Sequence, residues 1–93
     1  PLEAGKPSPE GIHQDGADYV FIMLLDRENV SGASNTIHNK SGGVIYEATL
    51  KQSGEAILID DKRHWHGVSK VLQDDKNLES HRDVLVLTFH KEA

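Results

Sequence analysis

The stretch from Asp83 to His90 reads Asp-Val-Leu-Val-Leu-Thr-Phe-His, and it indicates the fold class. Its apolar residues alternate along the chain and β-branched side chains are frequent, which is typical of a β-strand. A second stretch, Tyr19 to Leu25, is apolar at both parities, as expected of a strand covered on both faces in a sandwich or barrel. No part of the sequence shows sustained helical periodicity. The chain is therefore predicted to be all-β.

Shorter strand candidates lie between these two stretches and are separated by turn residues. The segment Asn39-Lys40-Ser41-Gly42-Gly43 predicts a hairpin turn, and Ser53-Gly54 predicts a turn between the two strands that flank it. Strands at such short spacing are typical of an antiparallel sandwich or barrel. Six or seven strands are expected, depending on whether residues 12–15 pair, whereas a jelly roll has about eight. The shorter candidates are residues 32–39, 44–50, 56–59 and 67–72.

The length and composition of the sequence exclude several classes of protein. The 93 residues fit one domain, and residues 1–11, which hold all three prolines, are expected to be an extended lead-in to it. A net charge of −5 argues against a nucleic-acid partner, and no apolar run approaches the length needed to span a bilayer. The absence of cysteine excludes disulfides and thiolate metal sites, so a cytoplasmic location is the default. The sequence does not begin with Met, which suggests a fragment.

Six histidines in so short a chain direct attention to metal chemistry. In His13-Gln14-Asp15 the first and third side chains of an extended segment project to the same side, so an imidazole and a carboxylate can converge on one ion. This pair alone is weak, because composition makes a chance His-x-Asp frequent. With a second histidine it would form the 2-His-1-carboxylate triad that leaves coordination positions open and suits Fe(II) oxygen chemistry.

The other five histidines are candidates for that distal ligand. His38 precedes a turn and His90 ends a strand, so both are expected at the surface. His64 and His66 share one parity at the opening of a strand, where a side chain can point into the mouth of a barrel. One of these two would be the ligand and the other a neighbour that orients it, or both would be incidental residues of an exposed turn. The fifth candidate is His81.

A metal with two neutral imidazoles and one carboxylate could be chelated by a dicarboxylate, whose far end then needs a cation. The arginines are Arg27, Arg63 and Arg82. Arg82 begins the last apolar strand, and its planar guanidinium could bind a carboxylate in a bidentate manner. The alternative is a strand-end charge paired with Asp83 or another acid, while Arg63 lies in a charged turn and is expected to face water.

Taken in order, these segments resemble a known family. The strings are Pro9–Gly16, Asp18–Ile22, Asn29–Gly32, Leu58–Val68 and Arg82–Phe89. Together they resemble the bacterial 2-oxoglutarate- and Fe(II)-dependent dioxygenases that include the free L-isoleucine 4-hydroxylases. The resemblance spans almost the whole chain.

The resemblance implies a double-stranded β-helix, the jelly-roll or cupin-like fold, with a metal site in its mouth. It implies that His13, Asp15 and His66 bind Fe(II), that Arg82 binds the far carboxylate of 2-oxoglutarate, and that His64 is a neighbour. The implied reaction uses O2, converts 2-oxoglutarate to succinate and carbon dioxide, and hydroxylates the side chain of a small free aliphatic amino acid or oxidises a thioether. It assigns no further catalytic residue, and the substrate-contacting residues remain unknown.

The sequence departs from the family in length. Family members carry helices and at least one more strand before the His-x-Asp segment, and this sequence lacks them. An unpaired sheet edge would result, which favours a homodimer. Glu10 could contact a substrate ammonium group or lie at the surface. Two rival interpretations remain, namely a jelly-roll module that binds a metal or small molecule without turnover, and a structural β-domain with incidental histidines.

Overall fold

The computed structural model describes residues 12–92, so the expected lead-in at residues 1–11 and Glu10 lie outside the described residues. Within this range the chain forms eight β-strands and no helix, as the all-β prediction requires. None of its described elements is a helix long and apolar enough to cross a membrane. The strands are β1 (Tyr19–Glu28), β2 (Val30–Gly32), β3 (Ser34–His38), β4 (Val44–Thr49), β5 (Ala56–Asp60), β6 (Trp65–Val68), β7 (Val71–Gln73) and β8 (His81–Phe89).

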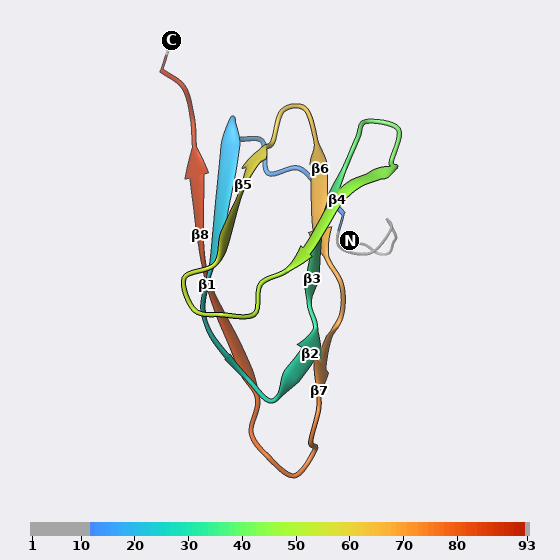
Figure 1. Ribbon diagram of the computed structural model, residues 1–93. Coiled ribbons are helices and arrows are strands. Elements are labelled where there is room, and N and C mark those ends of the chain that lie inside the picture. Colours follow the sequence, from blue (N-terminus) through green and yellow to red (C-terminus); the bar gives the residue numbers. More distant parts are fainter. Residues whose placement is uncertain (1–11, 93) are drawn as a thin grey trace.

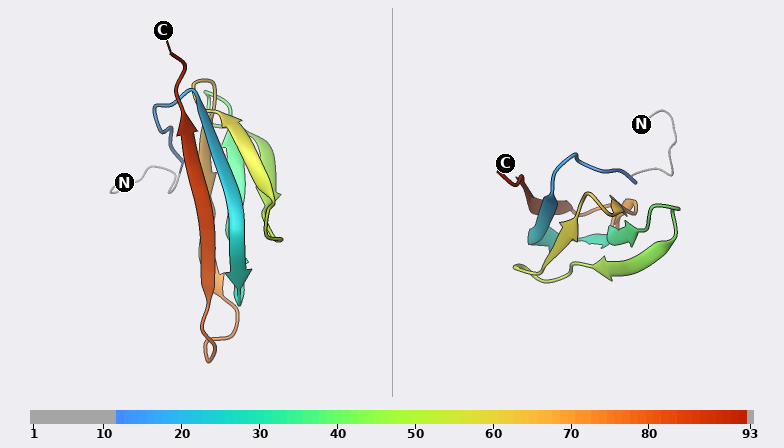
Figure 2. Two further views of the ribbon diagram at one scale, coloured as in Figure 1. Left: turned by 90° about the vertical axis from the view of Figure 1, so that its left-hand side faces the viewer. Right: turned by 90° about the horizontal axis from the view of Figure 1, so that it is seen from above.

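The strands form two facing three-stranded sheets and a short two-stranded extension (Figure 1). One sheet has the order β5-β1-β8, the other has the order β4-β3-β6, and β2 pairs with β7. Every pairing is antiparallel. Views from the side and from above show the two layers, with the segment before β1 passing over one end of them (Figure 2).

The core lies between the two layers and is small. Val20 of β1 and Ile59 of β5 are buried together with Ala17, and Ile37 of β3 packs against them from the other sheet. Because neighbouring side chains of a strand point to opposite faces, Val20, Ile22 and Leu24 face inward. The outward parity of β1, predicted to be covered, carries no second layer among the described residues. Leu58 and Phe89, on the strands beside β1, are 62% and 48% exposed.

One expected strand is broken into two, and another starts later than expected. The candidate at residues 32–39 becomes β3 only from Ser34, because Gly32 and Ala33 have φ angles of 73° and 55°, a left-handed conformation that separates β3 from β2, whose first two residues precede the candidate. A Cβ on Gly32 would lie 2.2 Å from the Lys70 carbonyl oxygen, so only glycine fits there. The expected strand at residues 67–72 is interrupted between β6 and β7, opposite Ala33. There the Ala33 N–H donates to the Lys70 carbonyl oxygen at 3.0 Å.

The predicted hairpin and the predicted turn at Ser53-Gly54 are both present. β3 and β4 pair across the turn at residues 39–43, as predicted. The strands on either side of Ser53-Gly54 do not pair with each other, because β4 joins β3 and β5 joins β1. The turn between them therefore carries the chain from one sheet to the other. Turn chemistry is local, and it cannot distinguish a hairpin from a crossing between layers.

Candidate metal centre

The His-x-Asp segment is held against β6 by its backbone. The His13 N–H donates to the His66 carbonyl oxygen at 2.8 Å, and the His66 N–H donates to the His13 carbonyl oxygen at 2.9 Å. Residues 12–15 therefore do pair, as an isolated bridge rather than as a full strand. This bridge places the two imidazole rings beside each other, with centroids 4.5 Å apart.

The side chains of His13, Asp15 and His66 converge on one point. His13 Nε2 lies 3.1 Å from Asp15 Oδ1, and His66 Nε2 lies 3.4 Å from Asp15 Oδ2. One ligand atom from each of the three residues lies within 4.8 Å of the others. Ligands on one face of an octahedral ion are separated by roughly 3 Å. The donor set, with two imidazole nitrogens and a carboxylate oxygen, fits Fe(II) with open coordination positions.

His66 is the buried member of this group, with a side chain 6% exposed against 53% for His13. Its burial, assisted by the neighbouring His13, lowers its pKa below the ordinary value, and the carboxylates of Asp15 and Asp61 only partly offset this. The ring is therefore neutral at pH 7, which is the form in which histidine binds metals.

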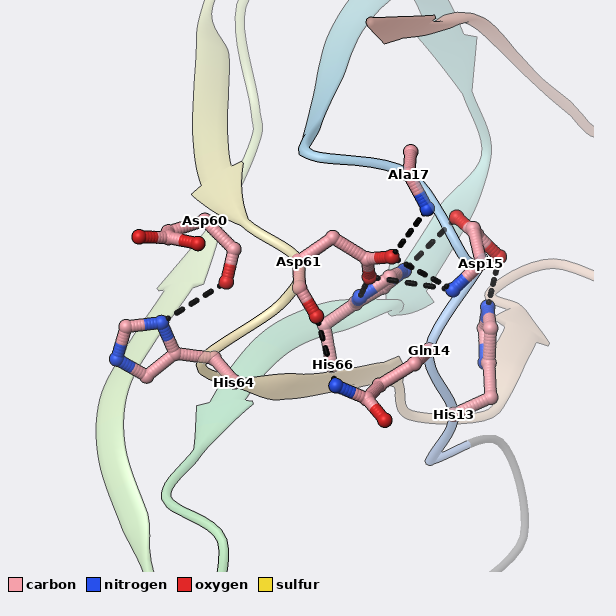
Figure 3. A network of polar contacts seen from close by, with 8 residues as sticks. All are labelled: His13, Gln14, Asp15, Ala17, Asp60, Asp61, His64 and His66. Atoms are coloured by element: carbon pink, nitrogen blue, oxygen red, sulfur yellow. Dashed lines mark hydrogen bonds and ion pairs between the residues drawn. The ribbon is translucent and has the colours of Figure 1, made fainter. Parts of the chain in front are cut away.

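Asp61 was not expected to belong to the site. It is 1% exposed, and its carboxylate accepts hydrogen bonds from the backbone N–H groups of Asp15 and Ala17 (Figure 3). The missed signal was parity. Asp61 follows the inward-facing positions Ile57 and Ile59 in the alternation of β5, so it was bound to face the core side.

The remaining histidines lie away from the three converging side chains. His64 Nδ1 contacts the Asp60 carbonyl oxygen at 3.1 Å, and its ring points away from His66 (Figure 3). His81 pairs with Asp26, and His90 is exposed as expected. The surface prediction for His38 is wrong, because it is only 5% exposed. The turn folds back over it, so that its ring contacts the Gly42 carbonyl oxygen and the Thr36 hydroxyl.

A cavity of about 260 Å³ opens beside the three converging residues. Its walls are mostly apolar and come from both sheets, and two polar side chains, Asn35 and Arg82, enter it. Arg82 Nε and Asn35 Nδ2 are buried, and neither has a hydrogen-bond partner within the described part of the chain. Unpartnered buried donors are costly, so their presence together indicates a binding site for an acceptor. Besides these two residues, the lining consists of His13, Asp15, Val20, Ile22, His66, Gly67, Val68, Val84 and Val86.

Arg82 is an uncompensated cation at this cavity. Its partial burial, with a smaller contribution from Arg27, lowers its pKa from the ordinary value, and among residues 12–92 it makes no ion pair. The alternative interpretation, a pair with Asp83, is therefore not what the structure shows. Arg27 instead donates to the carbonyl oxygens of Leu50 and Val30, and Arg63 is 82% exposed, as predicted. Arg82 is thus the arginine placed to attract an anion beside the three converging residues.

The profile of the family described as 2OG-Fe dioxygenase matches residues 1–88. The chain belongs to this family. Its cofactors are Fe(II) and 2-oxoglutarate, and its fold is the double-stranded β-helix that the resemblance implied. The two facing sheets of Figure 1 belong to that fold.

Similar proteins are longer than the dioxygenase chain. The bifunctional enzyme flvA of Aspergillus flavus is 27% identical over 101 residues, which cover 94% of this chain and 12% of flvA. The crystal structure of a bsmA homologue from Methylobium petroleophilum has a TM-score of 0.79 and 33% identity, covering 94% of this chain and 35% of that one. The structure of IDO from Bacillus thuringiensis has a TM-score of 0.76 and 27% identity, covering 92% and 41%.

Proposed function

We propose that this chain carries the catalytic centre of a dioxygenase that hydroxylates the side chain of a small free aliphatic L-amino acid, or oxidises a thioether. Family membership supplies the reaction class. The resemblance to free L-isoleucine 4-hydroxylases and the similarity to IDO support the substrate class. The single observation that carries the proposal is that one apolar cavity contains both the three converging ligand atoms and the unpartnered Arg82.

His13, Asp15 and His66 would hold the metal through Nε2, a carboxylate oxygen and Nε2, the atoms that face one another. When bound with 2-oxoglutarate and O2, Fe(II) supplies the oxidising power that breaks an unactivated C–H bond. The protein would hold the three ligands beside the cavity, and a set of three protein ligands would leave coordination positions open. The neutral state of His66 favours metal binding at pH 7.

Arg82 would bind the far carboxylate of 2-oxoglutarate. Its side chain shares the parity of Val84 and Val86, so guanidinium and valines line the same wall. The apolar side chains of this wall strengthen the charge interaction with Arg82. A dicarboxylate bound between the metal and Arg82 would leave the amino-acid substrate to approach from the open side.

The test is succinate release by the Fe(II)-loaded chain with 2-oxoglutarate, O2 and a panel of free L-amino acids. We expect release to rise with Ile, Leu or Met and to stay at background with Asp or Lys. Equal release with every amino acid would contradict the substrate class. Uptake of metal without any release would favour a binding module without turnover. A cytoplasmic location is part of the same proposal, since the substrates are free metabolites and the sequence has no cysteine.

A further inference from the structure

The carboxylate of Asp61 lies beside the two parts of the chain that supply the predicted metal ligands, the His-x-Asp segment and β6. Asp61 directly follows β5 and is 1% exposed. Its Oδ2 accepts hydrogen bonds from the N–H groups of Asp15 and Ala17, both at 3.0 Å, and its Oδ1 lies 3.1 Å from the Asp15 N–H. A buried carboxylate is costly unless it is hydrogen-bonded, and these backbone groups satisfy much of that need.

The same carboxylate also faces the ring of His66. Asp61 Oδ1 lies 3.6 Å from His66 Nδ1, which is buried and has no hydrogen-bond partner, while Nε2 on the other side of the ring faces Asp15. Figure 3 shows Asp61 between the His-x-Asp segment and the His66 ring. An imidazole that binds a metal through Nε2 carries its proton on Nδ1, and that proton needs an acceptor.

We propose that Asp61 is a positioning residue that fixes both parts of the metal site at once. Through the backbone N–H groups of Asp15 and Ala17 it holds the His-x-Asp turn, and through Nδ1 it sets the orientation and tautomer of His66. The proposal rests on the proposed metal site and deepens it. The turn is further fastened because Gln14 Nε2 donates to the Asp61 carbonyl oxygen at 2.7 Å.

If Asp61 had a purely structural role, it would only hold the turn at Asp15 and Ala17 in place. Loss of its hydrogen bonds would then lower the stability of the metal-free chain, but it would not change the His66 tautomer or the metal affinity of the folded protein. A positioning role predicts a change in both. The two roles are therefore separated by the tautomer of His66 and by metal binding, not by stability.

The first test observes the unsubstituted chain and uses one variant for signal assignment alone. Long-range proton–nitrogen NMR of the metal-free chain at about pH 8 reports which ring nitrogen of each neutral histidine carries the proton, and the His66→Gln variant assigns the signal. We expect His66 to be protonated on Nδ1. Predominant protonation on Nε2, with Asp15 as its acceptor, would contradict the proposal.

The second test compares Asp61→Asn with Asp60→Asn. In Asp61→Asn the amide oxygen is required at the Oδ2 position, which accepts from two backbone N–H groups, so the amide NH2 replaces Oδ1 and faces His66 Nδ1. A donor there favours the Nε2–H tautomer, which cannot bind a metal through Nε2. Asp60 is the matched control, because its side chain makes only an ion pair with the exposed Arg63.

Mn(II) serves as the probe, with affinity measured by titration under conditions where each variant is folded. We expect Asp61→Asn to bind Mn(II) about 10- to 100-fold more weakly and Asp60→Asn to bind it as the unsubstituted chain does. Unchanged affinity in folded Asp61→Asn would contradict the role of Asp61 alone. Failure of the unsubstituted chain to bind Mn(II) would contradict the proposed metal site itself. If Asp61→Asn does not fold, the tautomer of His66 in the unsubstituted chain, measured in the first test, decides between the positioning role and the structural role.

Discussion

At the scale of single residues, His64 and His66 are two positions apart yet have different environments. The His66 ring faces Asp15, whereas the His64 ring contacts a backbone carbonyl oxygen outside the metal centre. We therefore expect His66→Ala to abolish Mn(II) binding and succinate release, and His64→Ala to retain a substantial part of both. Comparable metal affinity in the two variants would exclude His66 as the distal ligand.

The unpartnered guanidinium of Arg82 leads to a second prediction. Removing a charged partner from a partly buried carboxylate pair costs about 2–5 kcal/mol, so Arg82→Ala should weaken 2-oxoglutarate binding by at least tenfold. Mn(II) affinity should change little, because no predicted ligand contacts Arg82. Binding of both ligands is measured by titration, with Arg63→Ala as the exposed control. An unaltered 2-oxoglutarate affinity in Arg82→Ala would assign the anchor to another cation.

His81 provides a prediction on pH. Its Nε2 lies 2.7 Å from Asp26 Oδ2, and this carboxylate, with smaller contributions from Asp83 and Glu28, raises the pKa of His81 above its ordinary value. The ion pair therefore stabilises the fold fully below the unfolded pKa of about 6.5, and the contribution is lost as pH rises through the higher folded value. In melting curves, His81→Gln should lower Tm at pH 5.5 more than at pH 9. An equal shift at both would refute the ion-pair contribution.

At the scale of elements, the close approach of β2 to the link between β6 and β7 depends on Gly32. Its φ of 73° and the 2.2 Å distance from an added Cβ to the Lys70 carbonyl oxygen both oppose a side chain. Gly32→Ala should lower the free energy of unfolding by about 1–3 kcal/mol. Gly54→Ala is the control, since Gly54 has a φ of 94° but open space around it, so it carries the backbone strain without the clash. Equal losses measured by urea unfolding would show that the contact with Lys70 is unimportant.

The elements also show what the sequence could and could not predict. Apolar runs predicted β1, β4 and β5, and alternation with β-branched residues predicted β8, because hydrophobic pattern is a local property of a strand. The breaks at Gly32 and Ala33 depend on a contact with the chain near Lys70, which local pattern does not contain. The same holds for the site. The resemblance named the three ligands and Arg82. The parity of Asp61 with Ile57 and Ile59 indicated an inward side chain, but its contacts with Asp15 and Ala17 could not be predicted, because those residues lie more than 40 positions away in sequence.

At the scale of the whole molecule, the sheet β5-β1-β8 exposes apolar side chains on its outer face, and β8 is one of its two edges, with no further strand beside it among residues 12–92. Such an edge favours pairing with a second copy. We predict association of this chain as its concentration rises, reduced by Leu87→Lys on the exposed face of β8. Gln52→Lys, in a loop, adds the same charge and should leave association unchanged. Light scattering measures both, and a monomer at all concentrations would contradict the prediction.

The central claim is that His13, Asp15, His66 and Arg82 form one site for Fe(II) and 2-oxoglutarate. The most direct measurement is an anaerobic titration of the Fe(II)-loaded chain with 2-oxoglutarate, observed in the visible spectrum. The account predicts that a metal-to-ligand charge-transfer band grows to saturation, that it is absent in His66→Ala, and that Arg82→Ala requires a higher 2-oxoglutarate concentration. A chain that binds Fe(II) and gives no band at any concentration would contradict the claim.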